Sequence, residues 1–296
     1  CVVCRALRQG ASAGRRSSGE NHLHSIAANG ADIPALGLGT WTLKGAECVA
    51  MVAEALKLGY RHVDTASAYD NEEAVGAGIR ASGVPRGDIF LTTKVWHTDL
   101  APRDFRRAAE ASLKRLGVGH LDLLLIHWPN PHVPLGDTLG ALNELRVRGL
   151  AQHIGVSNFT TALLAEAIRL SEAPLVADQV EYHPYLDQSK VHAACRAAGM
   201  AMVSYCPLHR GGELLSEKPV LDAAEAHGRT PGQIVLRWHV QQEGVVAIPR
   251  TTRKARLKEN LDIFGFSLTD VEMAAISGLA RDGSRLCDFK FSRKWD

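Results

Sequence analysis

Short apolar runs recur about every thirty residues from residue 25 onward, and stretches with helical spacing separate them. The runs are rich in Val, Ile and Leu and show no strict alternation of apolar and polar positions. This pattern is typical of strands that are buried on both faces of a parallel sheet. The sequence predicts eight such strands, at residues 36–40, 62–64, 89–95, 121–127, 153–156, 175–180, 200–205 and 245–248.

The stretches between the predicted strands place apolar residues on one face of a helix. Gly59 and Gly117 end two of these predicted helices. Thr160 and Thr161 are candidate N-caps of a third, and Pro231 suits the first turn of a fourth. The helical spacing is clearest at residues 48–56, 105–116, 139–147, 163–168 and 234–240. Strand–helix alternation repeated eight times predicts a (β/α)8 TIM barrel, and a doubly wound open sheet is the alternative.

A β-hairpin precedes the barrel pattern. Residues 24–28 and 33–36 flank an Asn-Gly pair, which is favoured in tight hairpin turns. Residues 1–24 are rich in Arg, Ser, Ala and Gly and lack an apolar run long enough for a secretory signal. We expect this segment to be disordered or a non-native extension, and residues 25–296 to form a single barrel with a short C-terminal tail.

Composition narrows the class of protein. A hydrophobic fraction of 46% is ample for a substantial core. The formal net charge is +2, and much of the positive charge lies in residues 1–24, so the nearly neutral remainder argues against nucleic-acid binding. No apolar stretch approaches the roughly 18 residues needed to cross a membrane. The six cysteines follow no zinc-ligand spacing, so we expect reduced thiols in a cytoplasmic protein. We also expect a monomer or a weak oligomer.

Four polar residues lie at or just beyond the ends of predicted strands: Asp64, Tyr69, Lys94 and His127. The carboxyl ends of parallel barrel strands share one face, so these side chains could meet there. A phenol has a pKa of ~10, and a nearby Lys94 ammonium would favour the phenolate and lower the pKa of Tyr69. Asp64 could hold Lys94 protonated, and His127 could donate a hydrogen bond to a carbonyl oxygen. Together they would protonate an oxygen on which negative charge develops.

None of these groups attacks carbon, so a hydride from a nicotinamide would complete a carbonyl reduction. Taken singly, each residue also has an ordinary interpretation as a cap, a loop aromatic, a solvated end or a packed ring. The joint placement at strand ends favours the catalytic interpretation. A Schiff-base lyase or aldolase with Lys94 as the nucleophile is an alternative on the same barrel, but it needs a lowered pKa for Lys94, which Asp64 opposes.

Longer runs in the same order resemble the aldo-keto reductases. They include Ile-His-Trp-Pro around His127 and Ile-Gly-Val-Ser-Asn-Phe, which ends at Phe159. The matching runs are residues 59–72, 93–96, 126–129, 154–159, 179–184, 204–208, 248–251 and 259–260. The resemblance covers roughly residues 25–281 and is to bacterial-type members with short loops. It implies a TIM barrel with an N-terminal hairpin and the NADPH-dependent reduction of aldehydes and ketones to alcohols.

The resemblance also implies roles for single residues. Tyr69 would be the proton donor, Lys94 and Asp64 would tune it, and His127 would orient the substrate carbonyl. These four residues are the predicted catalytic set.

A second set of residues would hold the nicotinamide half of the cofactor. By resemblance, Ser157, Asn158 and Gln179 would hydrogen-bond the nicotinamide carboxamide. Tyr205 would stack on the nicotinamide face, and Leu208 would also contact the cofactor. Amides and hydroxyls suit a carboxamide, and a tyrosine ring offers a flat surface. Without the order of the motifs, the same residues would be interpreted as turn, cap or core side chains.

A cluster of basic residues follows the last predicted strand and enters a helix N-terminus, where anions are favoured. By resemblance, Arg250 and Arg256 hold the 2′-phosphate of NADPH with Thr251 beside them, and Glu259 and Asn260 contact the adenine. Arginine can bind a phosphate through two parallel hydrogen bonds. The family often has Lys at the position of Arg250, a change that keeps the charge.

The substrate wall is less well defined by the sequence. Trp41, Trp96 and Trp128 are candidates for an apolar pocket, although tryptophans also fill cores. The loops that set substrate choice in the family are short here, which resembles members that act on small or polar carbonyls rather than steroids. Cys206 follows Tyr205 directly, so its oxidation could perturb cofactor binding, but a buried inert thiol is the simpler interpretation.

Other cofactor and metal motifs are missing from the sequence. No dinucleotide fingerprint of the Rossmann type occurs, and the family binds its cofactor extended over the barrel mouth. The thirteen histidines show no metal-ligand spacing, so we expect no metal. The rival function is a non-enzymatic, NADPH-binding redox-sensor module on the same barrel, which would retain the cofactor without turnover.

Overall fold

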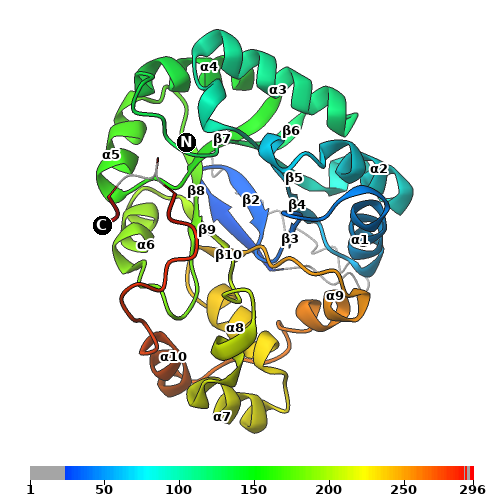
Figure 1. Cartoon of the computed structure of the whole chain (residues 1–296), viewed down its shortest axis with the longest axis vertical. Helices are drawn as coiled ribbons and strands as arrows, with labels where there is room; N and C mark the ends of the chain where they lie inside the picture. The colour runs from blue at the N-terminus through cyan, green and yellow to red at the C-terminus, as the bar shows by residue number, and fades with distance from the viewer. Residues whose placement is uncertain (1–23, 290, 292–293) are drawn as a thin grey trace, which may run out of the picture.

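The computed structural model describes residues 24–289, 291 and 294–296, and its centre is an eight-stranded parallel barrel (Figure 1). The expectation for residues 1–24 therefore falls almost wholly outside the described residues. The strands are β1 (Ser25–Ala28), β2 (Ala31–Pro34), β3 (Leu38–Gly39), β4 (His62–Asp64), β5 (Phe90–Val95), β6 (Leu121–Ile126), β7 (Ala151–Ser157), β8 (Leu175–Glu181), β9 (Ala201–Tyr205) and β10 (Val245–Ala247). Strands β3 to β10 follow one another around the barrel in chain order.

Helices form an outer ring around these strands (Figure 1). They are α1 (Gly45–Leu58), α2 (Glu72–Ser82), α3 (Pro102–Leu116), α4 (Leu135–Val147), α5 (Thr161–Leu170), α6 (Ser189–Ala197), α7 (Lys218–His227), α8 (Pro231–Val240), α9 (Lys254–Leu261) and α10 (Asp270–Ser277), with 3-10 turns at Ser67–Tyr69, Arg86–Asp88, His97–Asp99 and Gly212–Ser216. Thr160 accepts a hydrogen bond from the backbone of Leu163, which confirms it as the N-cap of α5. Gly59 ends α1 with a φ of 115°, a conformation that costs glycine little.

Backbone hydrogen bonds between the first and last strands close the barrel. The N–H of Gly37 donates to the carbonyl of Ala247 at 2.9 Å, and the N–H of Ala247 donates to the carbonyl of Ala35 at 2.9 Å. At this seam, a Cβ added to Gly39 would lie 2.6 Å from the carbonyl oxygen of Ile248. Only glycine therefore allows the two chains to approach so closely.

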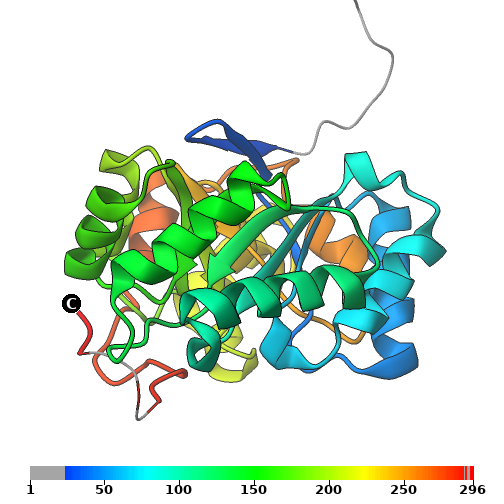
Figure 2. The ribbon, with the colours of Figure 1, turned by 90° about the horizontal axis from the view of Figure 1, so that it is seen from above.

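The N-terminal hairpin covers one end of the barrel. Its turn has positive φ at both Asn29 (44°) and Gly30 (90°), as the predicted tight turn requires. The Asn29 side chain donates to the carbonyls of Leu175 (2.7 Å) and Ala198 (2.9 Å), which fixes the hairpin to the barrel. Figure 2 shows the hairpin on one side of the molecule and the C-terminal tail on the other. The opposite end of the barrel is therefore left open for a site.

The predicted fold is confirmed, with differences at element boundaries. All six residues of β6 are buried, as expected for a strand that is covered on both faces. The first barrel strand is shorter than predicted, because only Leu38 and Gly39 pair regularly with β4. Helix α4 begins at Leu135, before the predicted apolar face. Helix α6 was expected only from the alternation, and helices α7 and α10 lie outside the eightfold alternation. No helix of the described segments is long and apolar enough to cross a membrane.

Candidate active site

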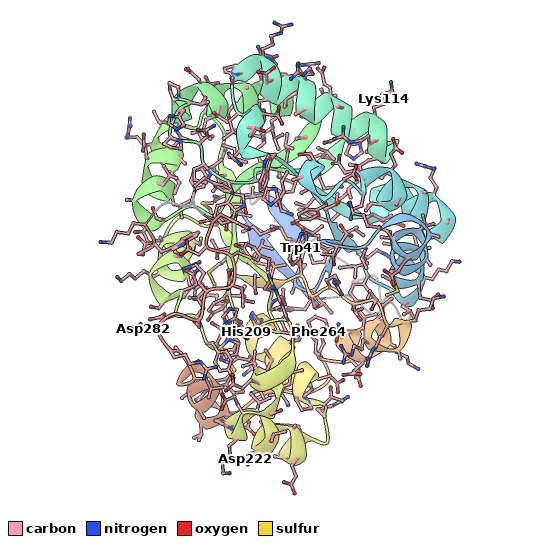
Figure 3. The ribbon with its side chains drawn as sticks, viewed as in Figure 1. Trp41, Lys114, His209, Asp222, Phe264 and Asp282 are labelled. Carbon is pink, nitrogen blue, oxygen red and sulfur yellow. The ribbon has the colours of Figure 1, made fainter. Side chains whose placement is uncertain are left out.

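The predicted catalytic residues meet at the carboxyl ends of neighbouring strands. Asp64 ends β4, Lys94 is the penultimate residue of β5 and His127 follows β6. Tyr69 lies in the 3-10 turn after β4. The side chains of Asp64, Tyr69 and His127 line a cavity of about 980 Å³, whereas Lys94 lies behind it, fully buried. Trp41 lies over the centre of the barrel, while Lys114 and Asp222 project from its rim (Figure 3).

Lys94 joins the carboxylate to the phenol. Its Nζ donates to Asp64 Oδ1 at 2.6 Å, to the carbonyl of Thr65 at 2.8 Å and to the Tyr69 hydroxyl at 3.5 Å. An ammonium group has three N–H donors, and these three acceptors use all of them. Asp64 Oδ2 in turn accepts from Gln179 Nε2 at 2.7 Å. The pair is thus buried with its polar groups satisfied, as a charge pair in a barrel interior must be.

The pKa of Tyr69 does not shift in the predicted direction. Burial and the Asp64 carboxylate raise this pKa well above its ordinary value. The expected lowering by Lys94 is therefore wrong, because burial disfavours the phenolate and because Asp64, 2.6 Å from the ammonium, offsets much of its charge. Burial also lowers the pKa of Lys94, and Asp64 opposes that shift. Tyr69 is consequently a neutral phenol that carries the proton it would donate.

His127 presents a neutral ring to the same space. Its pKa is held well below the usual value by burial and by the charges of Lys94 and His97. The ring stands edge-on to Tyr69 (5.6 Å between centroids) and to Trp96 (4.9 Å). Within the described part of the chain, its Nδ1 is buried and has no hydrogen-bond partner. A neutral imidazole can donate one hydrogen bond, and this ring is placed to do so at the cavity.

The residues expected at the nicotinamide form a network beside the catalytic set. Tyr205 donates from its hydroxyl to Asn158 Oδ1 at 2.7 Å, and Asn158 Nδ2 donates to the carbonyl of His127 at 2.9 Å. The Ser157 hydroxyl donates to the carbonyl of Gln179 at 2.7 Å. Asn158 and Tyr205 line the cavity, but Ser157 and Gln179 do not. The structure therefore brings two of these four residues to the cavity surface and places two behind it.

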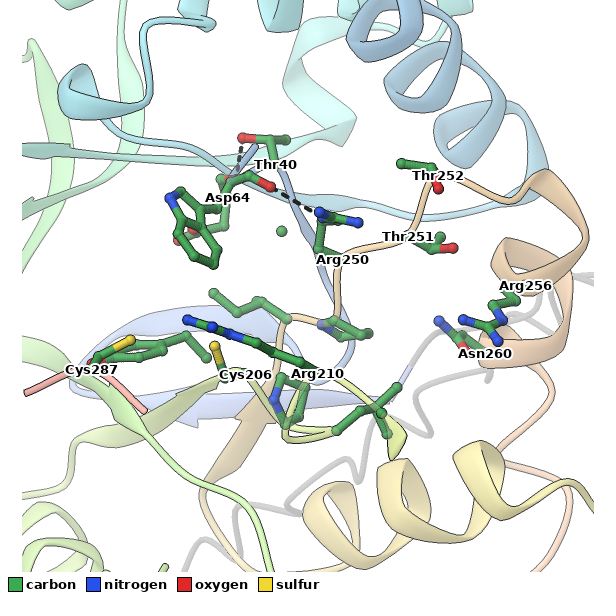
Figure 4. A pocket seen from close by; sticks show the side chains of 18 of the residues that line it. Thr40, Asp64, Cys206, Arg210, Arg250, Thr251, Thr252, Arg256, Asn260 and Cys287 are labelled. Atoms are coloured by element: carbon green, nitrogen blue, oxygen red, sulfur yellow. Dashed lines mark hydrogen bonds between the residues drawn. The ribbon is translucent and has the colours of Figure 1, made fainter. Parts of the chain in front are cut away.

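The opposite end of the cavity is cationic. Arg250, Thr251, Arg256, Glu259 and Asn260 all line the cavity, as does Leu208. Figure 4 shows Thr251, Arg256 and Asn260 together, on α9 and the segment that precedes it.

The two arginines at this end differ in their partners. Arg250 donates from Nε to the carbonyl of Trp41 at 3.2 Å and also to the Thr42 hydroxyl. Among the described residues, Arg256 forms no ion pair with an acidic side chain. Arg256 lies near the N-terminus of α9, where backbone N–H groups also favour an anion. The cation of Arg256 is therefore available to a phosphate.

Aromatic side chains enclose the catalytic end. Trp41, Trp96 and Trp128 line the cavity as expected, with Trp41 44% exposed and Trp128 buried. Phe289 of the C-terminal tail also lines it and packs edge-on against Trp128 at 5.5 Å. The wall around the catalytic residues is thus apolar on the side of the tail.

Several cavity residues were not assigned from the sequence. Thr40 hydrogen-bonds the backbone of Asp64 at 2.9 Å, and Arg210 lies over the Trp41 ring at 5.4 Å. Arg210 comes soon after the end of β9, so the strand-end rule used for the catalytic set could have found it. Cys287 comes from the tail, and no local pattern there signals a place in the site. Within the part of the chain that the structure describes, no group of His, Cys, Asp or Glu is placed to hold a metal ion.

Comparison with known proteins agrees with this geometry. The family model described as the Aldo/keto reductase family matches residues 35–281. The chain is 40% identical over 255 residues to the glyoxal reductase of Bacillus subtilis (strain 168), which covers 86% of this chain and 91% of that protein.

Two solved structures share the fold. The crystal structure of a "putative 2,5-diketo-D-gluconic acid reductase B" has a TM-score of 0.91 and 47% identity, covering 93% of this chain and 98% of that one. A Bombyx mori aldo-keto reductase in complex with NADP has a TM-score of 0.81 and 34% identity, covering 87% of this chain and 92% of that one. The chain therefore belongs to the aldo/keto reductase family and is an NAD(P)-dependent oxidoreductase that acts on carbonyl groups.

Proposed function

We propose that the protein reduces aldehydes and ketones to alcohols with NADPH, and that Tyr69 donates the proton. The observation that carries this proposal is the position of the Tyr69 hydroxyl at the cavity, with Lys94 behind it at 3.5 Å and the neutral His127 ring beside it. A neutral phenol, a buried ammonium and a hydrogen-bond donor are the groups that a developing alkoxide requires.

The cavity fits an extended dinucleotide phosphate. Its volume of about 980 Å³ lies at the upper end of the roughly 300–1,000 Å³ found for cofactor and ligand sites. Arg256 and Arg250 would hold the 2′-phosphate with Thr251, and Glu259 and Asn260 would contact the adenine. When bound, NADPH would supply the hydride that the carbonyl carbon accepts. The NADP complex of the Bombyx mori relative supports this choice of cofactor.

At the other end, Asn158 would hydrogen-bond the carboxamide directly, and Tyr205 would stack on the nicotinamide ring. Ser157 and Gln179 lie behind these two residues and are bonded to the backbone of β8 and to Asp64. For Ser157 or Gln179 to contact the carboxamide as predicted, their present hydrogen bonds must rearrange.

The chain's own groups would move one proton. His127 would donate a hydrogen bond to the substrate carbonyl oxygen and align it with the Tyr69 hydroxyl. As negative charge develops on that oxygen, it would become basic enough to take the proton from a phenol of high pKa. The Lys94 ammonium would stabilise the phenolate that remains, and Asp64 would hold Lys94 in position. Lys94 lies behind the cavity wall, so the structure gives no support to a Schiff-base reaction at its Nζ.

We propose small or polar carbonyl compounds as substrates. The named activities of two similar proteins, a glyoxal reductase and a diketo-gluconate reductase, concern such compounds. Phe289 of the tail and Trp128 line the catalytic end of the cavity in contact with each other, and we expect this wall to disfavour a bulky steroid.

Tyr69→Phe tests the proposal. NADPH oxidation is followed with a panel of aldehydes, ketones, keto acids and sugars. We expect kcat to fall by about 10²- to 10⁴-fold, the contribution typical of a positioned acid. NADPH affinity should stay within a few-fold of the parent protein. Tyr185→Phe is the matched control, because its hydroxyl bonds Glu217 outside the cavity. Undiminished turnover in Tyr69→Phe, or loss of NADPH binding instead of turnover, would show that the role of Tyr69 is misassigned.

A further inference from the structure

Two cysteines from distant parts of the sequence line the same end of the active-site cavity. Cys206 directly follows β9, whereas Cys287 belongs to the C-terminal tail. Figure 4 shows both sulfur atoms on the side of the pocket away from Arg256, with Arg210 beside Cys206. Both cysteines are reduced and partly accessible, and each thiol shifts the pKa of the other.

A buried carboxylate holds the tail in this position. Glu181, the last residue of β8, accepts hydrogen bonds from the backbone N–H groups of Leu286 (2.6 Å) and Cys287 (2.7 Å). The side chain of Glu181 is fully buried and also contacts His183 Nε2 at 2.9 Å. Burial opposes ionisation, but His183 and the two N–H groups outweigh it, so the pKa of Glu181 is lowered. Glu181 pairs with Tyr205 across β8 and β9, so the backbone of Cys287 is anchored to the barrel close to Cys206.

The loop that carries Cys206 is also tightly constrained. Cys206 has a φ of 51° and Arg210 a φ of 60°, a conformation that is uncommon for residues other than glycine. The N–H of His209 donates to the carbonyl of Cys206 at 2.8 Å and closes the turn. Anchors on both sides leave the two thiols little freedom to move apart.

The surroundings of the two sulfurs shift the pKa values of the two thiols in opposite directions. The neighbouring Cys287 thiol and the Arg210 guanidinium lower the pKa of Cys206, although burial opposes the shift. The Cys206 thiol, together with burial, raises the pKa of Cys287. Cys206 is thus the better nucleophile of the pair, and Cys287 is placed to resolve its oxidised form.

We propose that Cys206 and Cys287 form a reversible disulfide across the active-site cavity when the protein meets a peroxide. The Cys206 thiolate attacks hydrogen peroxide, which cleaves the O–O bond and gives a sulfenic acid and hydroxide. The Cys287 sulfur then attacks the Cys206 sulfur, forms the S–S bond and releases the sulfenic oxygen as hydroxide. The proton lost from each thiol neutralises one of the two hydroxides. In sum, two thiols are oxidised and one peroxide is reduced to two waters.

This proposal goes beyond carbonyl reduction, because it makes the enzyme sensitive to oxidants. The disulfide would join the tail covalently to the residue after Tyr205, whose hydroxyl donates to Asn158 in the lining of the cavity. In the reduced protein the tail is held by hydrogen bonds to Glu181, which can open during turnover, whereas the disulfide holds it covalently and restricts exchange of substrate and product through the cavity mouth. We expect kcat to fall by about tenfold or more in the oxidised protein, as when a loop opening limits turnover.

The other described cysteines provide internal controls. Cys48 and Cys195 are buried outside the cavity, and burial raises the pKa of Cys48 to about 11 and that of Cys195 well above its ordinary value. Both thiols therefore stay protonated and shielded, and peroxide should leave them unmodified.

Peptide mapping of the full chain tests the disulfide directly and does not depend on turnover. The protein is treated with graded hydrogen peroxide, alkylated and digested with trypsin without reduction. Cys206 and Cys287 fall in separate tryptic peptides, residues 197–210 and 286–290, each with a single cysteine. We expect these peptides to be linked, the link to rise with loss of activity, and dithiothreitol to reverse both. A link between any other pair, or sulfinic acid on Cys206 beside an unmodified Cys287, overturns the proposal.

Variants test the order of the two steps. In Cys287→Ala, dimedone should label Cys206 after peroxide treatment, because the resolving thiol is gone. Cys195→Ser should form the disulfide at the rate of the parent protein. Each variant is compared with its own reduced form, so that a change in basal activity does not affect the result. Absence of a dimedone adduct on Cys206 in Cys287→Ala, with the protein folded, contradicts its role as the attacking thiol.

Discussion

Replacing Arg256 with alanine should separate the binding of NADPH from that of NADH. The two cofactors differ only in the 2′-phosphate, and Arg256 is a cavity cation that forms no ion pair and no side-chain hydrogen bond among the described residues. Arg250, by contrast, already donates to Trp41 and Thr42. Loss of Arg256 therefore removes a cation that only the phosphate would engage.

The size of the effect follows from exposure and charge. A hydrogen bond to a charged group contributes about 1.5–3 kcal/mol. Arg256 is exposed at the rim of the cavity, so solvent and salt screen it and the lower half of this range applies. About 1.5–2 kcal/mol corresponds to a rise in the Kd for NADPH of roughly 10- to 30-fold. The Kd for NADH should change by less than about twofold, because NADH has no 2′-phosphate for Arg256 to contact.

Fluorescence titration with each cofactor at two salt concentrations measures these constants. Lys258→Ala is the matched control, since it removes a positive charge from the same helix without touching the cavity. The difference between Arg256→Ala and the parent protein should shrink at the higher salt concentration. Equal weakening of NADPH and NADH, or an equal effect of Lys258→Ala, would refute the assignment of Arg256 to the 2′-phosphate.

Two further predictions concern stability. Asp64→Asn should lower the free energy of unfolding by roughly 3–5 kcal/mol in urea titrations, because it leaves the buried Lys94 ammonium without its counter-charge. The control Lys44→Ala, which removes the exposed pair with Asp70, should lower it by less than about 1 kcal/mol. Similar losses in the two variants would contradict this account. Burial lowers the pKa of His239 from 6.5 to about 4, so the unfolded chain binds a proton between these values and the folded chain does not, and stability should fall by roughly 3 kcal/mol as pH falls through this window. His239→Gln should show a shallower pH dependence there, and an unchanged slope would exclude His239 as its source.

The barrel and the catalytic set could be predicted because both depend on position along the chain. Buried parallel strands leave a strong apolar signal, and polar residues at their carboxyl ends must share one face. Asp64, Lys94 and His127 follow this rule, and the structure brings them together. The ends of strands were harder to predict, because the hydrogen bonds there depend on the neighbouring strand. Only Leu38 and Gly39 of the first barrel strand, for example, pair with β4.

The electrostatics of Tyr69 could not be predicted from residue types alone. The sequence places an ammonium near the phenol, but the sign of the pKa shift depends on burial and on how closely Asp64 neutralises Lys94. The sequence also could not show that Ser157 and Gln179 lie behind the cavity surface. A motif says which strand end carries a side chain, but it does not say whether that side chain reaches the cavity or bonds another strand end behind it.

Two buried carboxylates at strand ends organise different halves of the site. Asp64 at the end of β4 fixes the ammonium behind the proton donor, and Glu181 at the end of β8 fixes the backbone of the tail. Each carboxylate accepts at least two hydrogen bonds from other segments, which offsets the cost of burying its charge. Because the tail is held through backbone groups, side chains such as Cys287 and Phe289 can vary without loss of the anchor. Substrate range and oxidant sensitivity can therefore change in this barrel while the proton-donating group stays in place.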